Sequence, residues 1–489
     1  MPDETHSLTS SIRTAAGLAL LLSSAWLLKG CTLSTPPDRS EVLARALPET
    51  TIIPDGWQQA GSVSDGIGDN WLASFDDPQL DQIVAEALAN NLDLRQSAST
   101  VLVVAQSINL AKSQMLPHVG ATAGEHWTRN FDRNYTNELN DVNIGLSWEL
   151  DIWGRLRAQK AAAEANYAAA ALDYAYARQS LAATTARSWF AAVQRVQLLA
   201  LAEQSTAIYD QLLTVSQARQ RAGKVSDFDV IQAQAALDAA QAGLQDAMNQ
   251  LAMARRNLEM LLGRYPAAEI ALAANATALP PPVQGVAPLS LLARRPDVLA
   301  AEQQVRSAFR SLEADRLALL PDLAFQLNVG RFSDNIGSLL DINPWLGHTS
   351  IGMKIPIYEG GALVAQIDIA DAQEQAAIAA YGSTVLKAFN EVETDLGNEY
   401  YLSSSLVYVD KAVASLGEAV QLANIRYQAG AADMQSTLQL QSRELATKAD
   451  ALDLRYSLLA NRVNLYLALG SSFDNEPVIP PQLVSALAP

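Results

Sequence analysis

Strict alternation of apolar and polar residues marks several short segments of the chain. Every second residue from Val142 to Ile152 is apolar, and the residues between them are Asn, Gly, Ser, Glu or Asp. The same period of two recurs over 323–329 and 351–357, and more weakly over 119–128, where Glu125 falls on the apolar side. This period predicts strands with one apolar and one polar face. We therefore expect two β-hairpins, turning near 132–138 and 333–345.

Long stretches without glycine or proline follow each hairpin. Residues 155–222 contain neither and are rich in Ala, Gln, Leu and Arg, which favour helix. They predict one helix of roughly 100 Å, at about 1.5 Å per residue, ending at Gly223. A second helix is expected over 224–262, with Ser226 and Asp227 as N-cap candidates. The pattern predicts the same pair over 362–429 and onward to 469, with a break at Gly430. Shorter helical arms are expected over 80–115 and 297–320, each ending in Leu-Pro.

These elements occur twice along the chain at a constant spacing. Gly154, Gly223 and Gly263 recur as Gly361, Gly430 and Gly470, each pair 207 positions apart (361 − 154, 430 − 223, 470 − 263). Arg219 and Gln234 recur in the same way as Arg426 and Gln441. Upstream, Pro117 recurs as Pro321 at an offset of 204 (321 − 117), so the second copy has three extra residues before Gly361. The constant offset indicates two copies of one structural unit.

Charge and residue types exclude several classes of function. The net charge of −18 and the absence of a basic block oppose nucleic-acid binding. No phosphate loop, dinucleotide fingerprint or nucleophile elbow occurs, and the four histidines form no metal-spaced pair on a helix. Glu149 and Asp151 could be paired acids, but the strand-to-helix transition at Gly154 needs caps, so we interpret them as lumen or turn residues. We therefore expect no enzyme, no catalytic residue, no metal and no cofactor.

The N-terminus carries an export signal. An apolar run over 14–28 follows Arg13 and precedes Cys31, the only cysteine of the chain. The run is too short to span a bilayer comfortably and is typical of a secretory signal. Cys31 is placed like the acylated cysteine of a bacterial lipoprotein, although Lys29 departs from the small residue usual there. An ordinary signal with an incidental cysteine is the alternative.

The hairpins and helices both require further copies of the chain. Four strands leave open sheet edges and are too few to close a barrel, and open edges do not persist in hydrocarbon. Aromatic residues near the strand ends fit a membrane-embedded barrel with interfacial girdles. The long Ala-rich helices need partners on two sides, and a ring of helices supplies them. A soluble β-sandwich edge is the alternative for the hairpins, and a lipid-anchored periplasmic helical scaffold without a pore is the alternative for the whole chain.

Three segments carry a resemblance to a known family. FDDPQLDQIVAEALANNLDLR (75–95), WELDIWGRLR (148–157) and LLARRPDVLAAEQQVRSA (291–308) resemble the TolC-like outer membrane factors, in their lipoprotein branch. With the duplication, the resemblance covers nearly the whole mature chain. It implies a homotrimer with a 12-stranded transmembrane β-barrel and a 12-helix periplasmic α-barrel. It also implies a passive exit duct for small molecules, a periplasmic adaptor and an inner-membrane RND-type pump as partners, and a bacterial outer-membrane location.

The resemblance also places a gate at the periplasmic ends of the helices. The tips map to the helix breaks at Gly223 and Gly430. The candidate gate residues are Asp229, Tyr427, Asp433, Ser436 and Gln439. Ser436 and Gln439 stand where family members commonly carry aspartates, and Asp433 lies close enough to substitute. The alternative for Asp229 and Asp433 is a role as helix-start caps.

The duplication and the resemblance together divide the chain into six parts. They are a signal peptide (1–30), an N-terminal anchor and equatorial segment (31–76), repeat 1 (77–263, with a hairpin over 118–152), an inter-repeat equatorial linker (264–290), repeat 2 (291–470, with a hairpin over 322–357) and a C-terminal equatorial tail (471–489). The cargo is not encoded in any motif that we find.

Overall fold

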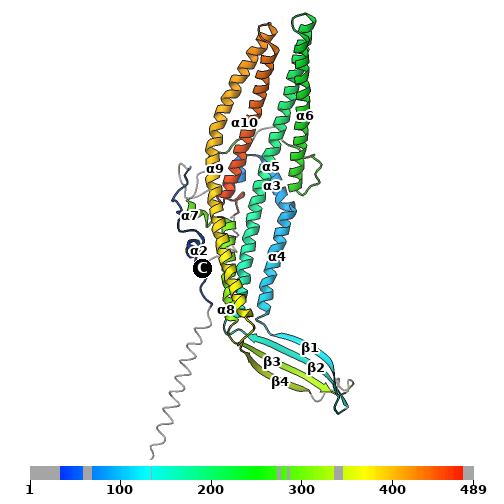
Figure 1. The fold of residues 1–489 in the computed structure, drawn as a ribbon, viewed down its shortest axis with the longest axis vertical. Coiled ribbons are helices and arrows are strands. Elements are labelled where there is room, and N and C mark those ends of the chain that lie inside the picture. Colours follow the sequence, from blue (N-terminus) through cyan, green and yellow to red (C-terminus); the bar gives the residue numbers. More distant parts are fainter. Residues whose placement is uncertain are drawn as a thin grey trace, which may run out of the picture.

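The helices stand as a tall layer with a small sheet at one end (Figure 1). A computed structural model describes residues 33–58, 69–133, 135–272, 277–282, 287–334, 337 and 345–476. The expected signal peptide, Cys31, most of the predicted turn at 333–345 and most of the C-terminal tail lie outside the described residues. Among the helices that are described, none has an apolar stretch long enough to cross a membrane.

The duplication is exact in the lengths of the principal helices. Helices α5 (Arg155–Arg221) and α9 (Ala362–Gln428) have 67 residues each, and α6 (Asp227–Leu261) and α10 (Met434–Ala468) have 35 each. The long helices predicted over 155–222 and 362–429 are therefore confirmed. The second helices begin three or more residues after each break, and Ser226, not Asp227, is the N-cap of α6.

The early arms differ from the prediction. The arm expected over 80–115 is two helices, α3 (Pro78–Asn90) and α4 (Leu92–Ser113), so the prediction of one helix was wrong. Asn91 interrupts it with an extended backbone, and its Oδ1 accepts a hydrogen bond from the Leu94 amide at 3.0 Å, which caps α4. In the second copy, α7 (Pro288–Leu291) precedes α8 (Pro296–Leu317).

Each copy builds a second tall column by placing two shorter helices end to end. The C-terminal end of α6 meets the α3–α4 junction, where Nδ2 of the Asn91 side chain donates to the Leu261 carbonyl at 3.1 Å. Gly263 (φ +70°) passes so close that an added Cβ would lie 2.8 Å from the Asn90 carbonyl oxygen. Gly470 (φ +70°) makes the matching approach to Arg294 at the top of α8. The column α4/α6 is thus repeated as the column α8/α10.

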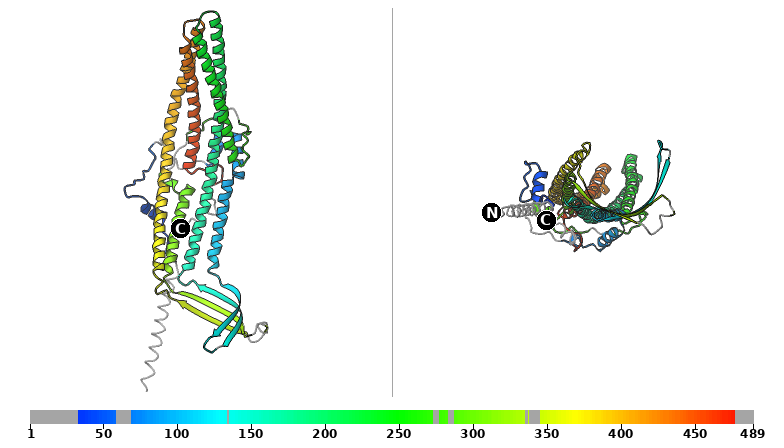
Figure 2. Two further views of the ribbon diagram at one scale, coloured as in Figure 1. Left: turned by 45° about the vertical axis from the view of Figure 1, so that its right-hand side comes forward. Right: turned by 90° about the horizontal axis from the view of Figure 1, so that it is seen from below.

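The four columns form one curved layer with a covering on one face. Helix α5 packs against α4 and α6 on one side and against α8 and α10 on the other, and α9 packs against α8 and α10. Helix α2 (Arg39–Ala46) packs on α9, and α3 packs on α5. We call α2, η1 (Trp71–Phe75), α3 and α7 the belt (Figures 1 and 2). The belt buries two apolar clusters against the layer, one around Trp71, Phe75 and Trp189 and one around Val42, Trp57 and Tyr381.

The two hairpins join into one antiparallel sheet in the order β1-β2-β3-β4. The strands are β1 (His118–Asn130), β2 (Tyr135–Leu150), β3 (Asp322–Ser333) and β4 (Leu346–Lys354). All four predicted strands exist. Ile152, Ile355 and Ile357 lie beyond the strand ends, because the chain turns toward the long helices there. The outer edges of β1 and β4 have no partner strand among the described residues.

The two faces of the sheet differ as the alternation predicts. Leu146 pairs with Leu327, Trp148 with Phe325 and Phe325 with Ile351, which gives a continuous apolar face that is largely exposed in the single chain. On the polar face, glycines oppose longer polar residues, with Gly124 opposite Asp141, Gly145 opposite Asn328 and Gly330 opposite Asn143. A Cβ at Gly145 would lie 2.7 Å from Asn328 Oδ1. Small residues on this face allow the sheet to curl into the trough visible end-on (Figure 2).

We expect Gly263→Ala to destabilise the protein more than Gly223→Ala. Both glycines have positive φ (70° and 69°), which costs an alanine about 1 kcal/mol. Only Gly263 also faces a backbone carbonyl, whereas nothing lies within 4 Å of a Cβ at Gly223. Thermal unfolding of the detergent-purified variants, followed by far-ultraviolet circular dichroism, measures the difference. Equal losses at the two positions would contradict the end-to-end packing of the columns.

Candidate functional site

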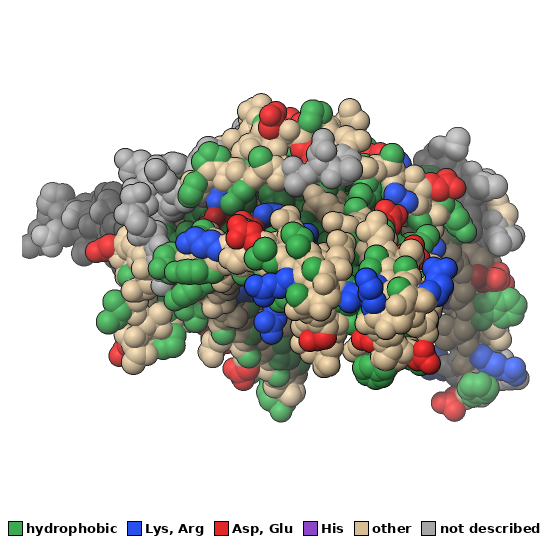
Figure 3. All heavy atoms as spheres, turned by 90° about the horizontal axis from the view of Figure 1, so that it is seen from above, with side chains coloured by type: hydrophobic (Ala, Val, Ile, Leu, Met, Phe, Trp, Pro, Cys, Tyr) green, Lys and Arg blue, Asp and Glu red, His purple; other side chains and the backbone are tan. Residues whose placement is uncertain are grey.

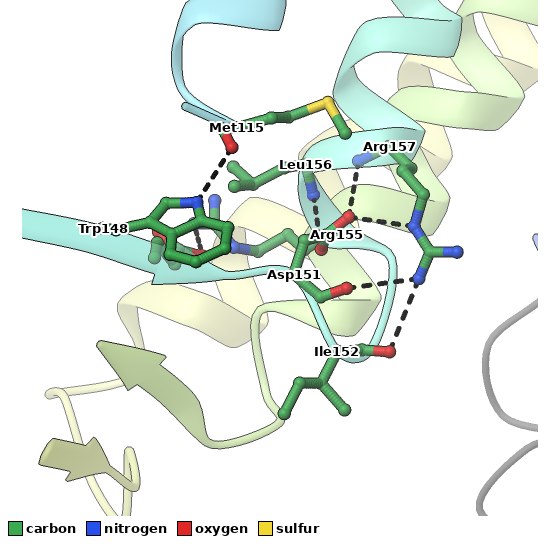
Figure 4. Close-up of polar contacts among 8 residues, drawn as sticks. Met115, Trp148, Asp151, Ile152, Arg155, Leu156 and Arg157 are labelled. Atoms are coloured by element: carbon green, nitrogen blue, oxygen red, sulfur yellow. Dashed lines mark hydrogen bonds and ion pairs between the residues drawn. The ribbon is translucent and has the colours of Figure 1, made fainter. Parts of the chain in front are cut away.

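The first candidate region is the junction at which the sheet continues into the long helix. Asp151 accepts hydrogen bonds from the backbone amides of Leu156 (3.1 Å) and Arg157 (3.0 Å), and from Arg157 Nε at 3.0 Å. Glu149 pairs with Arg155 at 2.6 Å. Figure 4 shows these contacts converging on the first turn of α5. Of the two roles predicted for Glu149 and Asp151, lumen or turn, these contacts support a role at the strand-to-helix turn.

Two tryptophans tie the junction to neighbouring segments. Trp148 Nε1 donates to the Met115 carbonyl at 3.0 Å (Figure 4), and Trp153 Nε1 donates to the Pro321 carbonyl at 2.8 Å. Met115 and Pro321 lie where the two early arms enter their strands. The motif from 148 to 157 therefore fixes the sheet to the helices from both copies at once.

The first described residues of the chain lie at this same junction. A Cβ at Gly154 would meet Leu33 Cδ2 at 3.2 Å, and the Ser34 amide donates to Glu313 Oε1 at 2.7 Å. Although burial opposes ionisation, hydrogen bonds from Ser34 and Arg310 hold the pKa of Glu313 below its ordinary value. The segment that follows Cys31 is thus anchored beside the base of the sheet.

The second candidate region is the pair of tips at Gly223 and Gly430. Both glycines adopt positive φ and end their helices identically. The Lys224 amide bonds to the Arg219 carbonyl at 2.9 Å, and the Ala431 amide bonds to the Arg426 carbonyl at 2.8 Å. These contacts satisfy carbonyls that a helix end would otherwise leave free. From above, basic, acidic and uncharged side chains are interspersed over the tips (Figure 3). The predicted helix breaks are confirmed.

Both aspartates proposed for the gate cap helices. Asp229 Oδ2 accepts from the Ser226 amide at 2.9 Å and from Ser226 Oγ at 2.8 Å, in a capping box. Asp433 is the N-cap of α10 and accepts from the Ser436 amide at 2.6 Å, and this bond holds its pKa below the ordinary value. Ser436 thus belongs to the cap. Gln439 is exposed and, with Ser436, lines a groove of about 910 Å³ between α10 and the α5–α6 pair.

Tyr427 packs against Arg219 of the other helical hairpin. Its ring is 2% exposed and lies under the Arg219 guanidinium, whose Cζ is 4.4 Å from the ring centre. Arg219 Nη1 also donates a hydrogen bond to the Tyr427 carbonyl. The Tyr427 hydroxyl has no hydrogen-bond partner among the described residues, so Asp229 does not hold it. Arg219 links α5 to α9 near the tips and was missed as a site residue, although its recurrence as Arg426 marked the position.

Metal ligation finds no support in the part of the chain that is described. No group of three or more His, Cys, Asp or Glu side chains is arranged to hold a metal ion there. His118 and His126 both lie on β1, and His126 Nε2 is 3.0 Å from Asp141 Oδ1 on the polar face of the sheet.

The architecture agrees with that of known proteins. The family model described as "Outer membrane efflux protein" matches residues 83–264 and 287–471, one copy of the duplicated unit each. The chain belongs to the outer membrane efflux protein family. This confirms the resemblance to TolC-like factors and the duplicated fold, and a periplasmic scaffold without a pore is not favoured. The protein is an outer membrane efflux channel.

Individual relatives span nearly all of the chain. The cation efflux system protein CusC of Escherichia coli K12 is 27% identical over 420 residues, which cover 85% of this chain and 90% of CusC. The probable outer membrane lipoprotein SilC of Salmonella typhimurium is 26% identical, covering 93% and 98%. The pyoverdine export outer membrane protein OpmQ of Pseudomonas putida is 28% identical, covering 86% and 92%.

Solved structures of efflux channels share the fold. A crystal structure of CusC matches with a TM-score of 0.79 at 25% identity, over 90% of this chain and all of that chain. The outer membrane channel CmeC of Campylobacter jejuni matches with a TM-score of 0.82 at 19% identity, over 94% and 98%. The long helices and the four-stranded sheet of one chain are thus those of this channel fold.

We expect Asp151→Asn to destabilise the junction more than Glu149→Gln. Asp151 is half-buried and caps two amides while it binds Arg157, so its loss should cost about 1–2 kcal/mol. Glu149 forms one ion pair with Arg155, and both side chains are partly exposed, so its loss should cost under about 1 kcal/mol. Thermal unfolding of the purified variants compares the two. A larger loss for Glu149→Gln would show that the cap does not hold the junction.

Proposed function

We propose that three copies of the chain form an outer-membrane exit duct that passively exports small molecules. The duct has a 12-stranded β-barrel in the membrane and a 12-helix barrel in the periplasm. It receives cargo from a periplasmic adaptor protein and an inner-membrane RND-type pump. The observation that carries the proposal is that the sheet and the helix layer are each incomplete at the same two lateral edges.

The sheet supports the shared barrel directly. Its apolar face carries exposed side chains such as Ile144, Trp148 and Ile351, which suit hydrocarbon. Lipid cannot satisfy the free backbone groups at the outer edges of β1 and β4, since the bilayer core holds no water. Pairing β1 of one copy with β4 of the next satisfies them and repeats around a closed ring.

The helix layer needs the same arrangement. The column α4/α6 at one edge exposes Leu102, Leu110 and Ile231, and α9 at the other edge exposes Val407 and Ile425. Each lateral edge of the layer therefore exposes an apolar stripe. Both stripes are covered when the α9 edge of one copy packs against the α4/α6 edge of its neighbour. A heterologous contact of this kind closes into a ring and leaves a bore on the face without the belt.

The sequence contains no phosphate loop or dinucleotide fingerprint, and we propose that energy comes from the pump through the adaptor. The relatives are named for different cargoes, cations for CusC and pyoverdine for OpmQ, although they share the family. We infer that cargo selection resides in the pump. We also propose the six-part division of the chain for the duct, with residues 77–263 and 291–470 as its two repeats.

We further propose that Cys31 carries the lipid anchor. Leu33 lies two residues later and packs against Gly154 at the base of the sheet. Two residues of extended chain span at most about 7 Å, so an acyl chain on Cys31 starts near the level where the strands enter the membrane. The outer-membrane lipid then holds the same level of the molecule as the barrel.

The gate of the proposed duct lies near the tips, and we assign its restraint to Arg219 and Tyr427. The arginine bridges the α5–α6 hairpin to the α9–α10 hairpin through the ring and the carbonyl of Tyr427. Asp229, Asp433 and Ser436 shape the tips by capping, and Gln439 faces the groove between the hairpins.

We expect Arg219→Gln to open the channel in planar bilayers. The loss of a guanidinium over an aromatic ring removes about 0.5–2 kcal/mol, which is about twofold to thirtyfold in the ratio of open to closed channels. Tyr427→Phe is the matched control, because it keeps the ring and the carbonyl and removes only a hydroxyl without a partner. Single-channel recording measures both open probabilities. Equal opening by the two variants would show that Arg219 is not the restraint. An absence of conductance from both variants and from the wild type would overturn the proposed duct.

We expect the mature protein to carry acyl chains that Cys31→Ser abolishes. Mass spectrometry of the intact protein purified from membranes should show the added lipid only in the wild type. The variant should still reach the outer membrane if its signal is cleaved, because the barrel holds it there independently. An unmodified wild-type protein would establish the alternative of an incidental cysteine.

A further inference from the structure

A polar pocket of about 280 Å³ lies among α5, α9 and α10. It lies farther along the columns toward the sheet than the proposed gate region does. Its walls include Arg187 from α5, Asp395 from α9 and Asn464 from α10. None of these residues belongs to the tips or to the sheet–helix junction. The volume is that of a small-molecule site and is too small for a peptide or protein segment.

Asp395 places a carboxylate without a partner in this pocket. The residue is 8% exposed, and its carboxylate oxygens remain accessible from the pocket, with no hydrogen bond or ion pair to them among the described residues. Its backbone carbonyl accepts a bond from Asn461 at 2.9 Å, which holds the position but not the charge. The other acid of the pocket, Glu391, is bound to Arg295 at 2.7 Å. A buried charge of this kind is costly unless something pairs with it.

Arg187 places the opposite charge in the same pocket. Its Nη1 donates to Asn464 Oδ1 at 2.7 Å and its Nη2 to Thr184 Oγ1 at 3.0 Å, so neutral groups orient the guanidinium. No carboxylate of the described chain lies within 4.0 Å of it, Asp395 included. Two opposite charges thus line one small pocket without touching, because separate helices hold each of them.

We propose that this pocket binds a small zwitterion, whose ammonium group pairs with Asp395 and whose carboxylate pairs with Arg187. One molecule with both charges neutralises both side chains at once, which a simple cation or anion cannot do. Asn390, Thr394 and Asn464 supply further hydrogen-bonding groups on the walls. A metal ion is a poor match, since Glu391 is already bound and the described residues hold no cluster of three ligating side chains.

The pocket opens on the face of the helix layer that the belt leaves free. On α5, Trp189 donates to Asp77 of the belt side at 2.9 Å, and Arg187 lies two residues away, about 200° around the helix. On α9, Glu393 accepts from the Gln58 amide at 3.1 Å, and Asp395 is again two residues away. The pocket therefore faces the bore of the proposed duct. Only this route into the pocket rests on the proposed function.

The site should bind more tightly as pH rises through neutrality. Burial and the nearby Glu391 raise the pKa of Asp395 to about 7, against a smaller opposite effect of Arg187. The other charges around it are already paired, Arg295 of α8 with Glu391 and Asp297, and Arg462 of α10 with Glu399. Only ionised Asp395 pairs with an ammonium group. The affinity should therefore fall about tenfold per pH unit below the pKa and level off above it.

Calorimetric titration of the detergent-purified full-length protein tests the site. The probes are glycine, β-alanine and γ-aminobutyrate, compared with butylammonium and butyrate, each at pH values on both sides of neutrality. At least one amino acid of the series should bind, while butylammonium and butyrate should bind at least tenfold more weakly. Asp395→Asn and Arg187→Gln should each weaken binding at least tenfold. Glu393→Gln makes the same change on the belt side of α9 and should leave binding intact.

The outcomes separate this site from the duct. Equal binding of butylammonium, or wild-type protein that binds none of the amino acids, overturns the zwitterion site. Asp395→Asn removes an unpaired buried charge, so its fold should be retained, and unchanged thermal unfolding confirms that lost binding is local. Binding is measured without a membrane. A protein that conducts ions but binds no zwitterion therefore refutes only the site, and one that binds but never conducts refutes only the duct.

Discussion

Two unpaired strand edges are the constraint on which the rest of the molecule depends. A four-stranded sheet with an apolar outer face belongs in the outer membrane, where free backbone amides and carbonyls have no water to bind. Gly124, Gly145 and Gly330 on the polar face allow the sheet to curl, but within one chain the outer edges of β1 and β4 do not pair with each other. The helices inherit this geometry, because the junction at Asp151 and Trp148 joins sheet and column rigidly.

The duplicated unit explains why the two halves of the chain have the same structure. Each copy pairs an unbroken helix of 67 residues with a column assembled from two shorter helices. The end-to-end joints at Gly263 and Gly470 let the chain enter and leave the layer at mid-height, and there the belt packs. A continuous second helix would offer no exit at mid-height. The joints therefore allow one layer to carry both the hairpin tips and the belt.

At the tips, two residues that the sequence offered for a gate are helix caps. Asp229 and Asp433 were candidates for a gate and for helix caps, and their hydrogen bonds are those of caps. The polar contact between the hairpins is made by Arg219, which binds the ring and carbonyl of Tyr427 beside a shared apolar cluster. Farther along the columns, Arg187 and Asp395 lie in one pocket although 208 positions (395 − 187) separate them in the chain.

Local physical chemistry in the sequence alone determined the strands, the long helices, their repeat and the helix breaks at the tips. The period of two, the long runs without glycine or proline, and the glycines at 223 and 430 each act within a few residues, so they can be read without a fold. The break at Asn91 was missed although its side chain caps α4 locally through the Leu94 amide, and its contact with Leu261 is remote in sequence. The contact of Tyr427 with Arg219 was missed because Arg219 is also remote in sequence. Only tertiary packing decided which side chains meet across columns and which charges are buried without a partner. Contact and desolvation depend on neighbours that sequence spacing does not reveal.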